Sequence, residues 1–456
     1  MLLATLYIIS IVISGYLATV ALSKSQRDTH SELIGLPLAL GTGLMSFLLF
    51  WISLAGIKPS QTVIAGIALS SILLFVVAKL SNLLPPITFQ TSSSFFTLKK
   101  SNPWVIISGI SFFSLSSLVM VSALSIPIFE WDAYSIWGYK AKILFNFSVN
   151  PKPQYFQDLS LSYSHLDYPL LVPLLMAGFY GALGNIDDQA VKVIFFLFYL
   201  ALWFISYAGF RWKLSRKHSI CLATMIVAVP SIVRWAGTGI ADVPLTVYYS
   251  GSILFLLKWI ENRERQDWVL SVLFTAFCVF TKNEGIALAI INLLVMAIFC
   301  NSRKNLSLVW ALTFFPAVIL VMLPYLLWSF DIPRTHENYI SRIQLSILLD
   351  NIWRLELLLP QFANELLKIS KWGLLWISGI ALAILGWPAF KKNYVQAAWI
   401  LFLLHIILYI FIYIITPWKV SDLLQISLDR LILHTVPAMG YIISFHWAEI
   451  YKSPNT

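Results

Sequence analysis

The sequence predicts an all-α polytopic membrane protein, and three observations support this prediction. The 456 residues are 59% hydrophobic and only 11% charged. The apolar residues form repeated runs of about twenty, which is the length that an α-helix needs to cross the hydrocarbon core of a bilayer. These runs are continuous and do not alternate with polar residues, so a transmembrane β-barrel is excluded.

The N-terminal third is predicted to be a scaffold of three spans with few ionisable groups. The spans are residues 2–22, 33–57 and 63–84. The first span lacks basic residues ahead of its apolar core, which favours a retained helix over a cleaved signal peptide. A connector rich in Ser, Thr and Pro follows at 85–102. The predicted domains are a transmembrane scaffold at 1–102, a catalytic transmembrane module at 103–330 with an external loop at 129–167, and a C-terminal part at 331–456 with an external loop at 331–371.

The net charge of +10 arises from short basic clusters that lie between the apolar runs. The clusters are Lys24–Arg27, Arg211–Lys217, Lys258–Arg265, Arg303–Lys304 and Lys391–Lys392. This pattern indicates cytoplasmic loops rather than a nucleic-acid site. The three cysteines lie within predicted spans and form no CxxC pair, so neither a disulfide framework nor a thiolate zinc site is supported.

Placing the basic clusters in the cytoplasm fixes the direction of the later spans. The predicted spans are 221–233, 243–259, 268–280, 286–300, 306–328, 374–390, 394–415 and 431–443. Several charged residues then lie at the external face, namely Asp242, Lys282, Glu284, Arg334, His336, Asp429 and Arg430. If Lys99–Lys100 is cytoplasmic, the span 105–126 brings Glu130 and Asp132 to the same face. We therefore predict an active site at the external face of the membrane.

One stretch of the chain must cross the membrane an odd number of times, because it connects the external face to the cytoplasm. Two apolar runs, 168–183 and 191–210, lie between the external Asp167 and the cytoplasmic Arg211. We expect 168–183, which contains Pro169 and Pro173, to be re-entrant or interfacial. The alternative is that Lys99–Lys100 is external and that the N-terminal half has the opposite orientation in the membrane.

The segment 129–144 (FEWDAYSIWGYKAKIL) carries the first candidate site. Acidic groups beside a bilayer are costly and tend to mark function. On an extended segment, Glu130 and Asp132 would point to one side, where a carboxylate could accept a proton from an acceptor group or bind a divalent metal such as Mg or Mn. Trp131 offers a surface for a sugar ring. The alternative is that the two acids cap the helix that follows.

The same segment has near-helical spacing of aromatic and basic residues. Tyr134, Trp137 and Lys140 suit an amphipathic helix on the outer leaflet, with the lysine toward phosphate groups. An aromatic belt at the membrane interface explains the tryptophan about as well.

Later external segments supply cations for a lipid-linked phosphate. Arg234 opens the stretch RWAGTGIAD, in which Asp242 precedes Pro244 and could simply begin a helix. Lys282 and Glu284 lie in TKNEG, near a helix N-terminus that would favour an anion, or in an ordinary polar hairpin. Arg334 and Arg430 provide two more guanidinium groups.

Known catalytic and metal-binding motifs are missing from the sequence. His165, His336 and His434 show no HxxxH or HxH spacing, so no metal site is assigned. The chain has no P-loop, GxGxxG or GxSxG motif. The energy for any chemistry must therefore arrive with the substrate, for example in a sugar linked to a lipid phosphate.

The motifs together resemble those of a known enzyme superfamily. The acidic loop, the HxxYP element at His165–Tyr168–Pro169, the RxxGxGxAD helix start and the KxEG turn resemble the GT-C integral-membrane glycosyltransferases. The nearest types are the ArnT-like and protein O-mannosyltransferase-like enzymes, which are related to glycosyltransferase family 39. The resemblance covers residues 103–300 and implies a GT-C-type transmembrane helix bundle with external loops that carry short amphipathic helices.

The resemblance implies an inverting transfer of a sugar from a polyprenyl phosphate to a lipid, glycan or protein acceptor, outside a bacterial plasma membrane. It implies Asp132 as the catalytic base with Glu130 as its helper. Lys282, Arg334, Arg430 and Arg234 would hold the donor phosphate. Substrate-binding residues would be Trp131, Tyr134, Trp137, Lys140, His165, Tyr168, Asp242 and Glu284. The alternatives are a polysaccharide ligase or polymerase that uses a diphosphate-linked glycan, and a transporter or flippase of lipid-linked sugars.

Overall fold

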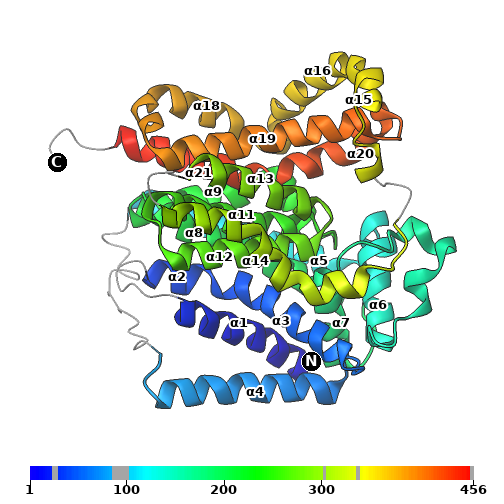
Figure 1. Cartoon of the computed structure of the whole chain (residues 1–456). Helices are drawn as coiled ribbons and strands as arrows, with labels where there is room; N and C mark the ends of the chain where they lie inside the picture. The colour runs from blue at the N-terminus through cyan, green and yellow to red at the C-terminus, as the bar shows by residue number, and fades with distance from the viewer. Residues whose placement is uncertain (23–28, 85–101, 301–304, 335–338, 452–456) are drawn as a thin grey trace. The chain divides into compact units, whose positions relative to one another are not determined.

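The computed structural model describes the chain except for residues 23–28, 85–101, 301–304, 335–338 and 452–456. His336, the pair Lys99–Lys100, most of the connector 85–102 and the basic clusters at 24–27 and 303–304 therefore lie outside the described residues. The described chain is helical and contains no strand (Figure 1). Eight of its helices are long and apolar enough to cross a membrane, or up to nine if α9 and α10 form one span. The predicted all-α polytopic class is confirmed.

The chain divides into two compact units. The N-terminal unit comprises Met1–Pro153, Leu170–Ala228 and Ala236–Gly239, and the C-terminal unit comprises Gln154–Pro169, Val229–Trp235 and Ile240–Thr456. The predicted domain boundaries near residues 102 and 330 stay predictions.

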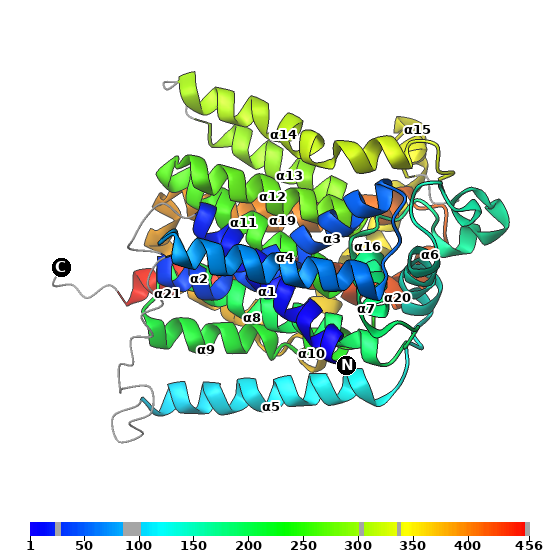
Figure 2. The same ribbon diagram turned by 90° about the horizontal axis from the view of Figure 1, so that it is seen from below.

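The N-terminal unit is a group of helices in which backbones approach closely. Its helices are α1 (Leu2–Leu22), α2 (Thr29–Gly35), α3 (Pro37–Leu54), α4 (Gln61–Leu80), α5 (Pro103–Ser125), α6 (Tyr139–Asn146), α7 (Leu171–Leu183), α8 (Val193–Arg211) and α9 (Arg216–Val227). A Cβ atom added at Gly15 of α1 would lie 1.7 Å from the carbonyl oxygen of Pro37, and one at Gly41 of α3 would lie 1.9 Å from that of Ile11. Only glycine allows this contact between α1 and α3, and α4 runs alongside α1 in Figures 1 and 2.

The short helix α7 corresponds to the predicted re-entrant segment. Its thirteen residues extend about 20 Å, which is less than the roughly 30 Å of a bilayer core. The helix is buried, and the Tyr7 hydroxyl and the Ser46 hydroxyl donate hydrogen bonds to the carbonyls of Leu175 and Leu171. Its length agrees with the expectation of an incomplete span, and whether it crosses the membrane stays a prediction.

The C-terminal unit is built around α11. Its helices are α10 (Pro230–Ala236), α11 (Asp242–Asn262), α12 (Arg265–Thr281), α13 (Glu284–Ile298), α14 (Asn305–Ser329), α15 (Leu345–Asn351), α16 (Leu355–Leu366), α17 (Ile369–Trp372), α18 (Leu375–Leu385), α19 (Asn393–Ile415), α20 (Val420–Leu433) and α21 (Val436–Ile450). The apolar window of α11 is entirely buried, and α12, α13, α19, α20 and α21 pack against it. Figure 2 shows α12, α13 and α14 in succession.

Two predicted spans of the C-terminal unit end or break earlier than expected. The run predicted at 374–390 ends as α18 at Leu385, because Gly386 and Pro388 follow. The run predicted at 431–443 is divided between α20, which ends at Leu433, and α21, which begins at Val436 with Pro437 in its first turn. The predicted loop 331–371 carries the short helices α15 and α16, and α16 buries Leu358 and Phe362 on one side.

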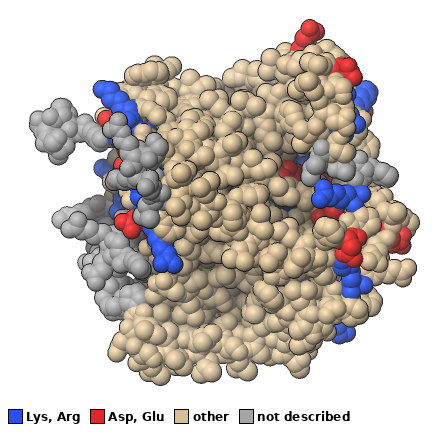
Figure 3. All heavy atoms as spheres, viewed as in Figure 1, with Lys and Arg blue, Asp and Glu red and all other residues tan. Residues whose placement is uncertain are grey.

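The surface agrees with a membrane environment. On the face shown in Figure 3, wide areas carry neither acidic nor basic side chains. Exposed apolar side chains of the candidate spans include Leu73 and Leu74 of α4, Phe113 of α5 and Leu320 of α14. Such positions suit contact with lipid chains.

Candidate functional site

Asp242, at the start of α11, is the centre of a buried group of charges. Only 1% of this residue is exposed, and its Oδ1 atom lies 2.9 Å from Nζ of Lys282. The helix cap is Ala241, and no side chain caps the first turn. Asp242 is therefore the first helical residue and directs its carboxylate into the unit, so the simple capping role does not describe it.

Lys282 joins two acids at the break between α12 and α13. Its Nζ lies 2.9 Å from Asp242 and 2.8 Å from Oε1 of Glu284, the first residue of α13. Gly285 makes this break compact, since a Cβ atom there would lie 2.1 Å from the carbonyl oxygen of Cys278. Burial opposes the positive charge, but Asp242 and Glu284 outweigh it and raise the pKa of Lys282 above its ordinary value. The ammonium is therefore fixed in its charged form.

Two basic side chains from the end of α20 complete the surroundings of Asp242. Nη1 of Arg430 lies 3.9 Å from Oδ2 of Asp242, and Nε2 of His434 lies 3.3 Å from Oδ1. His434 is fully buried, whereas 16% of the Arg430 side chain is exposed. The structure thus brings together four of the predicted site residues, which are Asp242, Lys282, Glu284 and Arg430.

Buried polar contacts continue from His434 into α19. The Tyr409 hydroxyl lies 2.7 Å from Nδ1 of His434 and 2.7 Å from Nε2 of His405. All three residues are fully buried. Neither His405 nor Tyr409 was among the predicted site residues, because each lies within an apolar run. A histidine in the middle of a span was the one available signal, since ionisable groups inside a membrane tend to be functional.

Arg234 and Arg430 lie against the same aromatic ring. The guanidinium carbons are 4.7 Å and 6.0 Å from the ring centre of Trp235. The indole Nε1 donates a hydrogen bond of 3.3 Å to Asp429, which also lies 3.5 Å from Nζ of Lys371. Arg234 is exposed, so this pair of arginines offers the more accessible positive charge of the region.

The other predicted residues of the C-terminal unit lie outside this charge cluster. The ring of His165 lies 4.6 Å from that of Tyr168, and both residues are half-buried. The intervening Asp167 accepts a hydrogen bond of 3.1 Å from Asn283, next to Lys282. Arg334 is exposed and makes no ion pair with a residue that the structure describes.

The segment that carries Glu130 and Asp132 is helical rather than extended. The helix begins at Trp131, includes a π-helical turn at Ala133–Gly138 and continues as α6. Asp132 has right-handed helical dihedral angles and makes no side-chain capping bond. Glu130 precedes this helix and Asp132 lies in its first turn, so the extended geometry expected for the pair is absent, and whether both carboxylates reach one ligand stays a prediction. Both acids are half-buried, and π-turns within α-helices are frequent at functional sites.

The predicted amphipathic helix on the membrane surface is also corrected. Trp137 is 1% exposed and Lys140 is fully buried, so neither side chain lies in the headgroup layer. Trp131 and Tyr134 remain accessible, with 67% and 55% of each residue exposed. The π-helical turn changes the spacing of side chains, which explains why the regular helical period failed here.

An ion pair that the sequence did not reveal anchors α6. Nζ of Lys142 lies 2.6 Å from Oδ2 of Asp188, whose Oδ1 accepts a hydrogen bond of 2.8 Å from Tyr180 of α7. The same ammonium lies 5.2 Å from the ring centre of Tyr134. This contact fixes the helix that follows Asp132 against the end of α7.

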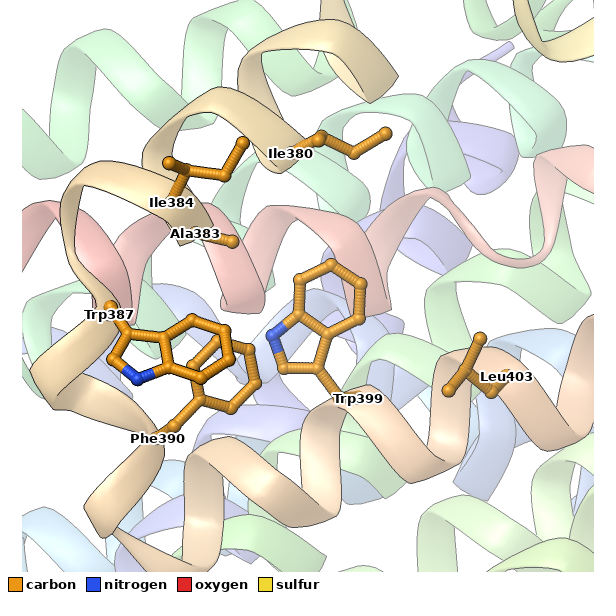
Figure 4. A pocket seen from close by; sticks show the side chains of 7 residues that line it. All are labelled: Ile380, Ala383, Ile384, Trp387, Phe390, Trp399 and Leu403. Carbon is orange, nitrogen blue, oxygen red and sulfur yellow. The ribbon is translucent and has the colours of Figure 1, made fainter.

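Among the described residues, clusters of metal-binding side chains are absent and an apolar groove is present. No group of three or more His, Cys, Asp or Glu side chains among the described residues could hold a metal ion. A groove of about 240 Å³ lies between α18 and α19 (Figure 4). Its lining is apolar, with Trp387, Phe390 and Trp399 as the largest side chains, so it lacks the polar groups that a sugar or phosphate requires.

Comparison with known proteins relates this region to an enzyme family. Residues 167–328 match the family described as dolichyl-phosphate-mannose-protein mannosyltransferase. No curated protein and no solved structure matches the chain. The matched segment contains Arg234, Asp242, Lys282 and Glu284, whereas Asp132 lies outside it. The match confirms the predicted resemblance to GT-C-type membrane glycosyltransferases and indicates an enzyme that uses a lipid-linked sugar.

Proposed function

From this likeness to membrane glycosyltransferases, we propose that the protein moves a sugar from a polyprenyl phosphate to an acceptor at the external face of the membrane. The observation that supports this proposal is the group formed by the buried Asp242 and Lys282 with the half-buried Glu284, which lies within the matched segment. Charges at the end of a membrane-spanning helix are costly and tend to be kept for function.

The donor phosphate is assigned to the arginines beside Trp235. Arg234 and Arg430 both lie near its ring, and a guanidinium can give two parallel hydrogen bonds to one phosphate. Lys282 is committed to two carboxylates, so its proposed role is to organise the group. Arg334 remains a proposed further contact for the phosphate.

Asp132 is the proposed general base, with Glu130 as its helper. Asp132 takes the proton of the acceptor hydroxyl as the acceptor oxygen attacks the anomeric carbon. The bond between this carbon and the phosphate oxygen breaks, and the polyprenyl phosphate leaves with the electron pair. One displacement of this kind inverts the anomeric carbon. Trp131 and Tyr134 expose aromatic faces on which the sugar ring can stack.

The remaining predicted residues have supporting roles in this proposal. His165 and Tyr168 would contact the substrate, while the buried Trp137 and Lys140 would support the helix that carries Asp132. A divalent cation at Glu130 and Asp132 remains a prediction, to be tested by adding Mg or Mn. The acceptor would be a lipid, a glycan or a protein.

The test is glycosyl transfer by the purified full chain with a panel of polyprenyl-phosphate sugars. Asp132→Asn keeps the shape of the side chain and removes the base, so we expect turnover to fall by about 10²–10⁴-fold with donor binding retained. Asp350→Asn is the matched control, because this exposed acid in α15 lies outside every proposed site. Equal turnover in wild type and Asp132→Asn would exclude Asp132 as the base. The absence of turnover with every donor would favour a transporter of lipid-linked sugars.

A further inference from the structure

His405, Tyr409 and His434 form a continuous chain of polar contacts that ends at Asp242. The two contacts of the Tyr409 hydroxyl are each 2.7 Å long, and the contact between His434 and Asp242 is 3.3 Å. His405 and Tyr409 lie in α19, a candidate membrane span, and His434 follows α20. Bulk water cannot reach any of the three side chains, which are fully buried.

The chemistry of a hydroxyl allows only two directions for this chain. Tyr409 has one hydrogen to donate, so it can donate to one imidazole and must accept from the other. If it donates to Nδ1 of His434, then His405 carries its proton on Nε2. If it donates to Nε2 of His405, then His434 carries a proton on Nδ1.

The His405 end favours the first direction. Nδ1 of His405 is buried and makes no hydrogen bond with a described residue. In the second direction a neutral His405 would carry its proton on this nitrogen and leave a buried N–H without an acceptor. The first direction also leaves one buried N–H outside a hydrogen bond, that of Nε2 of His434, but this N–H lies 3.3 Å from a carboxylate oxygen of Asp242 and is the less costly of the two. The ring is also held in place, at 5.0 Å from that of Tyr249.

The Asp242 end independently favours the same direction. In the first direction, His434 holds its proton on Nε2, which lies 3.3 Å from Oδ1 of Asp242 in an electrostatic contact outside hydrogen-bond geometry. In the second direction, a neutral His434 would place the lone pair of Nε2 against this carboxylate oxygen. Lys282 keeps Asp242 ionised, so the two negative regions would repel each other.

We infer that the three residues form a directed hydrogen-bond chain, from His405 through Tyr409 to His434, that positions the Asp242 carboxylate. His405 donates from Nε2 to Tyr409, Tyr409 donates to Nδ1 of His434, and the Nε2–H of His434 faces Asp242. Because Nδ1 of His434 accepts a hydrogen bond, His434 stays neutral. The negative charge of Asp242 is then balanced by Lys282. His434 and Tyr409 are thus positioning residues, and their effect on turnover rests on the proposed function.

The first test reads the imidazole protonation directly. The full chain is labelled with ¹⁵N-histidine, and the signals of His405 and His434 are assigned through single substitutions. We expect both rings of the wild type to be Nε2–H tautomers at neutral pH. In Tyr409→Phe, His405 should lose its single tautomer and Nδ1 of His434 should lose its hydrogen bond. Tyr413→Phe is the matched control, because Tyr413 is a buried tyrosine one turn later whose hydroxyl contacts Ser427 at 2.7 Å.

The second test links the chain to turnover of a polyprenyl-phosphate sugar. We expect Tyr409→Phe to lower kcat/KM about tenfold, as the loss of one hydrogen bond near a charged group would do, with Tyr413→Phe near the wild type. His434→Gln restores an N–H donor toward Asp242 and should keep more activity than His434→Leu. Nδ1–H tautomers in the wild type, or equal spectra and turnover of the two Phe variants, would overturn the inference. A wild type that turns over no donor would refute the proposed function, while the ¹⁵N spectra would still decide the direction of the chain.

Discussion

Two acid–lysine pairs, one in each unit, show how burial changes what a charged pair does. In the C-terminal unit the side chains of Lys282 and Asp242 are 10% and 2% exposed. In the N-terminal unit those of Lys142 and Asp188 are 24% and 23% exposed. The buried pair is surrounded by further polar partners, whereas the second pair joins two elements near the surface. The first is a fixed part of the interior, and the second is a local anchor.

The difference follows from the cost of removing charges from water. A buried ion pair is tolerated only with good geometry and additional hydrogen bonds. Lys282 meets this condition through Asp242 and Glu284, and Asp242 meets it through Lys282, Arg430 and His434. The helix after Asp132 is held at Lys142 by a single ion pair that is partly open to water.

The largest expected effect is the loss of Lys282. Lys282→Met removes the cation that lies nearest to the buried Asp242 and to the half-buried Glu284, and breaking a buried pair in this way costs about 3–5 kcal/mol. We expect a marked fall in the midpoint temperature of thermal unfolding. Tryptophan fluorescence of the detergent-solubilised protein measures this midpoint. Lys282→Arg keeps the charge and should be much less destabilised.

The control for this comparison is an exposed lysine of the same unit. Lys419 pairs with Asp422 at 3.3 Å, and the two side chains are 76% and 67% exposed. Lys419→Met should leave the midpoint unchanged, because exposed pairs contribute little. If Lys282→Met unfolded at the same temperature as Lys419→Met, the buried contacts of Lys282 would contribute no more to stability than an exposed pair.

A smaller effect is expected at the pair in the N-terminal unit. Lys142→Met removes the 2.6 Å contact with Asp188, but Asp188 keeps its hydrogen bond from Tyr180 and some access to water. We expect a loss of about 1 kcal/mol. A double-mutant cycle with Asp188→Asn measures the coupling directly. A coupling as large as the loss at Lys282 would remove the distinction between the two pairs.

Much of the fold could be predicted because membrane helices follow from local hydropathy. The continuous apolar runs gave the spans now seen as α1, α4, α11, α14 and α19 to within a few residues. The apolar run at 168–183, which was expected to be re-entrant or interfacial, forms the short α7, and its place in the membrane stays a prediction. The match at residues 167–328 agrees with the enzyme class that the motifs suggested.

The site was predicted less completely because side-chain partners depend on packing between distant segments. The grouping of Asp242, Lys282, Glu284 and Arg430 followed from topology. The roles of His405 and Tyr409 did not, since they become visible only when α19 is placed beside α20. The π-helical turn at Ala133–Gly138 likewise has no simple sequence signal, and the buried Trp137 and Lys140 lie in and just after it.

The smallest expected effect concerns an acid whose surroundings lie between those of the two pairs. Burial raises the pKa of Glu365 in α16, but hydrogen bonds from Lys368 and Lys371 lower it by more, so the net pKa lies below its ordinary value. A carboxyl group with a lowered pKa stabilises the fold above its unfolded pKa, and this contribution is lost as pH falls through the folded pKa. We expect Glu365→Gln to have a slightly lower thermal midpoint than the wild type at pH 7. The variant should also lack the fall in midpoint that protonation of Glu365 causes in the wild type. Because both forms are neutral at this position in acid, their midpoints should converge as pH falls. If the thermal midpoints of the two proteins differed by the same amount at every pH, the two lysines would not stabilise the ionised form of Glu365. An acid would then need the complete enclosure seen at Asp242 before its charge contributes to stability.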